Sequence, residues 1–131
     1  MTGPPPPAMP GPPRPVGPAD AVRARVPAVL DVYAQTRTTV LEGGIVDRGL
    51  KELCARFLAG DEAVAARDER EQAALDWATA IGWNSDLADD DLWQRLHAHF
   101  SEPELVELGY AIAFTLGQQH WLRTLGVDPL A

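Results

Sequence analysis

Apolar residues recur at intervals of three and four along most of the chain after residue 26, which predicts a succession of amphipathic helices. The first helix is expected to begin at Pro27, because the fixed φ of proline suits a first helical turn, and to end at Gly43 and Gly44. The second is expected between Asp47, a suitable N-cap residue, and Gly60. The positions that share one face of each helix are Val29, Tyr33, Thr36 and Val40, and then Leu50, Leu53, Cys54, Phe57 and Leu58.

Two further helices are expected in the middle of the chain. Asp68 is the expected N-cap residue of the third helix, with Glu71 as its reciprocal partner in a capping box, and Gly82 ends this helix. Asp89 is the expected N-cap residue of the fourth. The alanine-rich segment 61–67 fits either a loop or a helical turn. The expected buried faces are Ala74, Trp77, Ala78 and Ile81 in the third helix, and Leu92, Trp93, Leu96 and Phe100 in the fourth.

The last helix has the clearest start signal. Ser101 is the expected N-cap residue, with Pro103 in the first turn and Glu104 as the reciprocal partner, and the helix is expected to end at Gly126. Between residues 105 and 116 it is apolar nearly all round, which places it at the centre of the fold or in a subunit interface. No long stretch alternates as a strand would, so the chain is predicted to be all-α, with about five main helices.

Proline content divides the chain into two parts. Nine of the twelve prolines lie in residues 1–18, which predicts a disordered, proline-rich tail that cannot build a core. Residues 19–131 are long enough for one small helical domain. The tail has no continuous apolar run, so a secretory signal is not expected, and no later segment is long enough to span a membrane.

The balance of charge limits the classes of partner. The chain of 131 residues has a net charge of −8 and a pI near 4.7. Its eleven basic residues are scattered and form no stripe of the kind that nucleic-acid binding needs, so neither nucleic acid nor an anionic membrane is expected as a partner. The single cysteine, Cys54, excludes an internal disulfide and fits a cytoplasmic location.

Three segments together resemble a known family. In residues 44–53 (GIVDRGLKEL), an acidic and a basic residue precede the motif Leu-x-Glu-Leu. Residues 68–75 form an acidic helix start that is followed by an Ala-Leu pair. The most specific likeness lies in residues 87–127. Extending over about 80 residues, these segments resemble the carboxymuconolactone decarboxylase and alkylhydroperoxidase D-like family. The resemblance implies an all-α, alkylhydroperoxidase D-like domain that assembles into homo-oligomers, as trimers or hexamers.

The chain also departs from that family. Redox members carry Cys-x-x-Cys-x-x-x-His about a dozen residues after a glutamate that corresponds to Glu52. At that distance this chain has Val64 to Glu71, a stretch without cysteine or histidine. Because a dithiol peroxidase needs one thiolate to attack and a second thiol to resolve the product, that activity is not expected here.

Glu52 is the one residue of the family's catalytic relay that has a match, and the resemblance implies a catalytic carboxylate. The competing interpretation is a surface ion-pair ladder, because Arg48 and Arg56 stand four residues before and after it.

His120 is the second candidate catalytic residue. It lies in a polar break, Gly117 to Trp121, within an otherwise apolar helix, and it shares a helix face with Ala113 and Gly117. An imidazole that titrates near neutral pH suits acid–base catalysis in a pocket. The competing interpretation is a hydrogen-bonded seam between helices or subunits.

Other candidate side chains have structural explanations. Cys54 lies on an apolar stripe, where a free cysteine behaves as a small hydrophobe, and the alternative is a reactive thiol. His97 and His99 point about 200° apart on a helix, so they cannot share a metal ion, and no metal site is expected. The four tryptophans are expected as core and interface anchors or as walls of a pocket for a flat substrate, and they are Trp77, Trp83, Trp93 and Trp121.

Three functions follow from these observations. The resemblance implies a cofactor-free enzyme of the lyase or isomerase type that acts on a small unsaturated acid, lactone or carbonyl compound. Glu52, matched by the resemblance, and His120, from the polar break in the last helix, are its candidate acid–base groups. The second is a non-catalytic helical oligomerisation module with a decayed active site. The third is a peroxidase that uses Cys54 alone and an external thiol.

Overall fold

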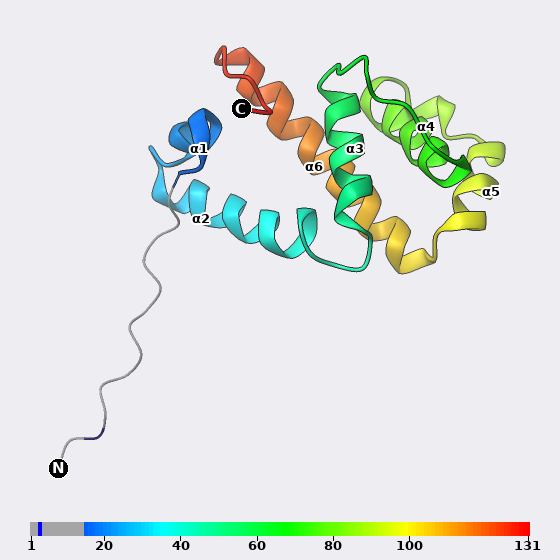
Figure 1. Cartoon of the computed structure of the whole chain (residues 1–131), viewed down its shortest axis with the longest axis horizontal. Helices are drawn as coiled ribbons and strands as arrows, with labels where there is room; N and C mark the ends of the chain where they lie inside the picture. Colours follow the sequence, from blue (N-terminus) through cyan, green and yellow to red (C-terminus); the bar gives the residue numbers. More distant parts are fainter. Residues whose placement is uncertain (1–2, 4–14) are drawn as a thin grey trace.

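The computed structural model describes residue 3 and residues 15–131, and within them every regular element is a helix (Figure 1). The prediction of an all-α chain is therefore confirmed for this part. The elements are α1 (Gly17–Arg23), α2 (Pro27–Thr36), the π-helical turn η1 (Arg37–Leu41), α3 (Arg48–Leu58), α4 (Glu69–Trp83), the 3₁₀ turn η2 (Ser85–Leu87), α5 (Asp90–His99) and α6 (Glu102–Thr124).

The predicted helix starts agree closely with the structure. Asp47, Asp68 and Asp89 each accept a hydrogen bond from the backbone amide three residues later, as N-cap residues do. Ser101 and Glu104 form the complete capping box. The segment 61–67, left open by the sequence, is a non-helical connection.

Three details differ from the prediction. Glu71 does not complete a capping box with Asp68, because its carboxylate accepts from the backbone amide and guanidinium of Arg67 instead. Trp93, expected in the core, is 47% exposed, since it lies at the edge of α5 against Trp77. Val29 is exposed, and Leu30 is the residue of α2 that is buried.

Helix α1 was not predicted, because its seven residues show no apolar period and follow a run of prolines. The two residues that open it, Gly17 and Pro18, belong to the stretch 1–18 that was expected to be a tail. Apart from these two and from residues 3, 15 and 16, the predicted tail lies outside the described residues.

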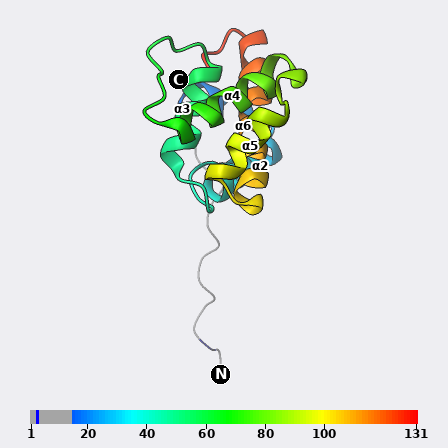
Figure 2. The ribbon, with the colours of Figure 1, turned by 90° about the vertical axis from the view of Figure 1, so that its right-hand side faces the viewer.

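Helix α6 is the central element of the fold. It runs between α1 and α2 on one side and α3, α4 and α5 on the other (Figure 1). Turned by 90°, the molecule shows α4 and α5 toward the viewer (Figure 2). Leu108 and Ile112 of α6 are buried in the core, and Gly109 lets α4 approach, since a Cβ there would lie 2.7 Å from the Trp77 ring. The other main core side chains are Leu50, Leu53, Cys54, Leu58, Ala74, Ala78, Leu92 and Leu96.

A buried ion pair ties the loop before α3 to α6. The ammonium of Lys51, whose side chain is 3% exposed, lies 3.1 Å from Oε2 of Glu107 and donates to the carbonyls of Val40 and Gly43. Glu107 also accepts from the backbone amides of Ile45 and Val46. All three ammonium donors of the lysine are thus satisfied, which is the condition for burying this charge.

Gly44 is required where the loop meets this carboxylate. Its φ is +86°, which favours glycine, and a Cβ there would lie 1.8 Å from Oε1 of Glu107. The carboxylate cannot move aside without losing the loop amides and Lys51.

Replacing Glu107 with glutamine tests the clamp that the Glu107 carboxylate forms with Lys51 and the loop amides. Burial would raise the pKa of Glu107, but the amide of Val46, the Lys51 ammonium and the amide of Ile45 outweigh burial and hold it below its ordinary value of 4.5. The contribution of the carboxylate to stability is therefore complete above about pH 4.5 and is lost as the pH falls through the folded pKa. Glu107→Gln is expected to lower the free energy of unfolding at pH 7 by about 3 kcal/mol, because Lys51 stays buried without its counter-charge.

Urea unfolding followed by tryptophan fluorescence between pH 7 and pH 3 measures this effect. The difference in free energy of unfolding between the parent protein and Glu107→Gln should become smaller as the pH falls. Glu62→Gln, at an exposed position, is the matched control and should match the parent protein. A Glu107→Gln variant as stable as the parent at pH 7 would show that the clamp contributes nothing.

Candidate functional site

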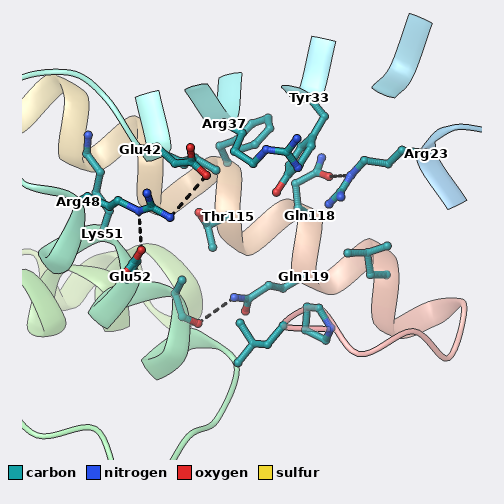
Figure 3. Close-up of a pocket in the computed structure, with 16 residues that line it drawn as sticks. Arg23, Tyr33, Arg37, Glu42, Arg48, Lys51, Glu52, Thr115, Gln118 and Gln119 are labelled. Carbon is teal, nitrogen blue, oxygen red and sulfur yellow. Dashed lines mark hydrogen bonds and ion pairs between the residues drawn. The ribbon is translucent and has the colours of Figure 1, made fainter. Parts of the chain in front are cut away.

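A cavity of about 210 Å³ lies between the N-terminal helices and the rest of the fold. Side chains of α2 and η1 form one wall, and side chains of α3 and α6 form the other (Figure 3). Pro129 and Leu130 also line the cavity. Aromatic and aliphatic side chains contribute apolar surface, and they are Tyr33, Leu41, Phe114 and Leu122. The remaining lining is unusually rich in charged and amide groups.

One end of the cavity holds two arginines that share one carboxylate. Asp20 of α1 is 1% exposed and accepts from Nη1 of Arg23 and Nη1 of Arg37, each at 2.8 Å, and from the backbone amide of Val16. Burial would raise the pKa of Asp20, but the hydrogen bonds from Arg37, Val16 and Arg23 outweigh burial and lower it. Asp20 is therefore a fixed negative charge behind two guanidinium groups.

Aromatic contacts hold the same end together. The guanidinium carbon of Arg23 lies 3.4 Å from the centre of the Tyr33 ring, a cation–π contact. Tyr33 stacks nearly parallel to Phe114 of α6, with ring centres 5.8 Å apart. Nε of Arg23 donates to Gln118 of α6 at 3.1 Å. These contacts join the N-terminal helices to α6 across the cavity.

The opposite end holds Glu52. Its carboxylate accepts from Nε of Arg48 at 2.6 Å, and Arg48 lies 3.6 Å from Glu42. Both Arg48 and Glu52 have side chains that are 57% exposed, so this pair stands at the mouth of the cavity. Glu52 also borders an open groove lined by Arg56 and by the segment that follows α3.

The turn η1 shapes the wall between the two ends. The amide of Glu42 donates to the carbonyl of Arg37 at 2.8 Å, an i to i+5 bond that makes this a π-helical turn. The first and last residues of the turn, Arg37 and Leu41, both line the cavity. Single π turns are frequent at functional sites, and this one supports the choice of this cavity.

Gln119 of α6 is a buried polar group beside the cavity. Its Nε2 donates to the carbonyl of Ala55 at 2.8 Å, which fixes the amide orientation, because a flipped amide would place two oxygens in contact. Its Oε1 is buried and has no hydrogen-bond partner among the described residues. An unsatisfied acceptor of this kind is rare in folded proteins, and a bound water or a ligand would satisfy it.

The structure does not bring His120 to the cavity. Gln118 and Gln119 line it, whereas His120 is exposed on another side of α6 together with Ala113 and Gly117. The reason is helical geometry, since successive residues are turned by about 100°. The sequence therefore pointed to the polar break in α6. The candidate taken from it, His120, is the neighbour of Gln118 and Gln119, which line the cavity.

The remaining candidates also lie away from the cavity lining. None of the four tryptophans lines it, and His97 binds Glu102 at 2.7 Å without contacting His99. No group of three or more potential metal ligands occurs among the described residues. In the same part of the chain, no helix has the length and apolar character needed to cross a membrane.

Several residues at the cavity could not be predicted from the sequence. Asp20, Arg23 and Arg37 lie outside the three segments that carry the family resemblance, and no local pattern links them. Lys51 had one available signal, because it is the single lysine in a chain with ten arginines. In a chain that otherwise uses arginine, a single lysine indicates a position that needs a compact ammonium and not a guanidinium.

Comparisons of the chain with protein-family models, with curated proteins and with solved structures find no match in any of the three.

Cys54 provides a direct test of thiol chemistry. The side chain is buried, and burial, followed by the negative charges of Glu71 and Asp47, raises the pKa of its thiol to about 12. A peroxidase would need an accessible thiolate, whereas this buried thiol stays protonated at pH 8. We expect an aromatic disulfide reagent at pH 8 to react slowly with the native protein and quickly after unfolding in guanidinium chloride. Rapid reaction of the native protein would contradict the buried, protonated state.

Proposed function

We propose that this chain is a cofactor-free acid–base enzyme of the lyase or isomerase type and that Glu52 transfers the proton. The observation that carries the proposal is that Glu52, the residue matched to the family relay, borders a cavity with aromatic walls and guanidinium groups. Its volume of about 210 Å³ is below the range typical of drug-sized ligands, so the substrate is small. A small unsaturated acid, lactone or related carbonyl compound has the matching size and chemistry.

Arg48 orients the proposed catalytic carboxylate. Its guanidinium holds one oxygen of Glu52 at 2.6 Å and leaves the second oxygen for a substrate proton. A general base needs this kind of fixed position within hydrogen-bond reach of the proton that it removes. Lys51 is not available for the reaction, because its three donors are bound by Val40, Gly43 and Glu107.

The proposal includes self-association through an exposed face of α6. Small residues in the middle of this face would let a second helix approach closely, and large apolar residues flank them. The face consists of Val106, Tyr110, Ala113, Gly117, His120 and Trp121. His120 would then lie in a seam between subunits, which is the second of its two expected roles.

One observation favours the non-catalytic alternative. Glu52 is exposed and paired with Arg48 at i−4, as in an ordinary surface ladder, although Arg56 turns to Asp61 instead of extending it. A helical oligomerisation module would retain this pair without using it. Turnover measurements separate the two functions.

Glu52→Gln tests the catalytic role. We expect the parent protein to convert members of a panel of small unsaturated acids and lactones, followed by loss of ultraviolet absorbance. The variant should lose about 10²- to 10⁴-fold in kcat, the usual contribution of a positioned general base. Glu62→Gln is the control and should keep full activity. If the parent converts no compound in the panel, the non-catalytic alternative is supported.

Ala113→Glu tests the assembly. A charge in the middle of the α6 face would be buried by a second copy, so the parent protein should be a trimer or hexamer and the variant a monomer of 14.2 kDa. Light scattering coupled to size exclusion measures both masses. Ala98→Glu, at an exposed position of α5, is the control. A parent protein that is itself monomeric at micromolar concentration would refute self-association.

A further inference from the structure

The charges around the cavity are unevenly distributed. At one end, Arg23 and Arg37 face the single carboxylate of Asp20, so this end carries one excess positive charge. At the other end, Arg48 lies between Glu42 and Glu52, so that end carries one excess negative charge. In Figure 3, Arg48 and Glu52 lie on the opposite side from Arg23, and Glu42 lies between Arg48 and Arg37. The buried pair of Lys51 and Glu107 is balanced and changes neither end.

We propose that Arg37, supported by Arg23, binds the carboxylate of a planar organic acid and thereby turns the rest of the molecule toward Glu52. This inference deepens the proposed function, and it rests on the same cavity being a ligand site. It adds the residues that select the substrate and the direction in which the substrate lies.

Donors remain for such a ligand. Arg37 uses one nitrogen, Nη1, to bind Asp20, and within the described part of the chain no acceptor is found for its Nε or Nη2. Its side chain is 25% exposed and lines the cavity. A guanidinium presents its donors as a planar fork that matches a carboxylate in two parallel hydrogen bonds.

The guanidinium groups are held in place before a ligand arrives. Asp20 is a positioning residue, because its buried carboxylate binds both arginines and lies behind them. Arg23, 4% exposed, is additionally fixed by Gln118 and by the Tyr33 ring. Binding therefore needs little further ordering of these side chains, which favours affinity.

The wall beside the arginines is aromatic. Tyr33 and Phe114 stack with an angle of 18° between their planes and line the same cavity. Arg23 already covers the Tyr33 ring at 3.4 Å, and Tyr110 stacks on Phe114, so a small conjugated body would meet the free edges of these rings while its carboxylate meets Arg37. An inorganic anion would use the charge alone.

Benzoate and its neutral isostere benzamide are suitable probes for the full chain. By isothermal titration we expect benzoate to bind on the order of 10- to 100-fold more tightly than benzamide, because a charge-assisted pair is lost in the amide. Arg37→Gln should weaken benzoate binding by a similar factor and leave benzamide binding unchanged. Arg37→Lys retains the charge but not the planar fork of donors. Its affinity for benzoate should therefore lie between those of the parent protein and Arg37→Gln. Arg25→Gln, at an exposed position next to α1, is the control.

Each outcome separates this inference from the proposed enzyme activity. Benzoate binding by the parent protein without turnover of any panel compound would refute the enzyme and keep the carboxylate site. Turnover together with equal binding of benzoate and benzamide, or with no effect of Arg37→Gln, would overturn the carboxylate site alone. Inorganic phosphate that competes as strongly as benzoate would overturn the preference for a planar organic acid. Circular dichroism and melting confirm that each variant is folded.

Discussion

The buried pair of Lys51 and Glu107 is the interaction on which the arrangement of this protein depends. It joins the loop before α3 to the middle of α6, and it does so through charge-assisted hydrogen bonds around a buried ammonium. The loop leads directly into Arg48 and Glu52, so the position of the candidate carboxylate follows from it. Neither partner can be removed alone without leaving a buried charge or unsatisfied loop amides.

The second constraint is the way the N-terminal helices are attached. α2 buries one residue, Leu30, and the attachment to α6 relies on polar and aromatic contacts through Arg23 and Tyr33. Because these contacts leave a hollow, the boundary between the two parts of the fold becomes a cavity. The arginines that fasten the helices are thus also the charges that the cavity presents.

Helix α6 serves three environments at once. Leu108 and Ile112 pack into the core, Gln118 and Gln119 enter the cavity, and Tyr110 and His120 face outward. A helix that is apolar nearly all round in its first half has this capacity, because it offers a buried face to more than one neighbour. Because neighbouring residues of α6 lie in different environments, the hydrophobic pattern alone could not show which of them line the cavity.

The sequence by itself determined the helical class, the capping residues Asp47, Asp68, Asp89 and Ser101, and the apolar stripe around Cys54, because these depend on contacts three or four residues apart. It also directed attention to Glu52 and to the polar break in α6. Only the tertiary structure decided that Gln119, and not His120, faces the cavity, and that Asp20 joins two arginines from separate elements. Contacts between residues far apart in the chain leave no periodic signal, so neither pairing could be predicted from the pattern of residues.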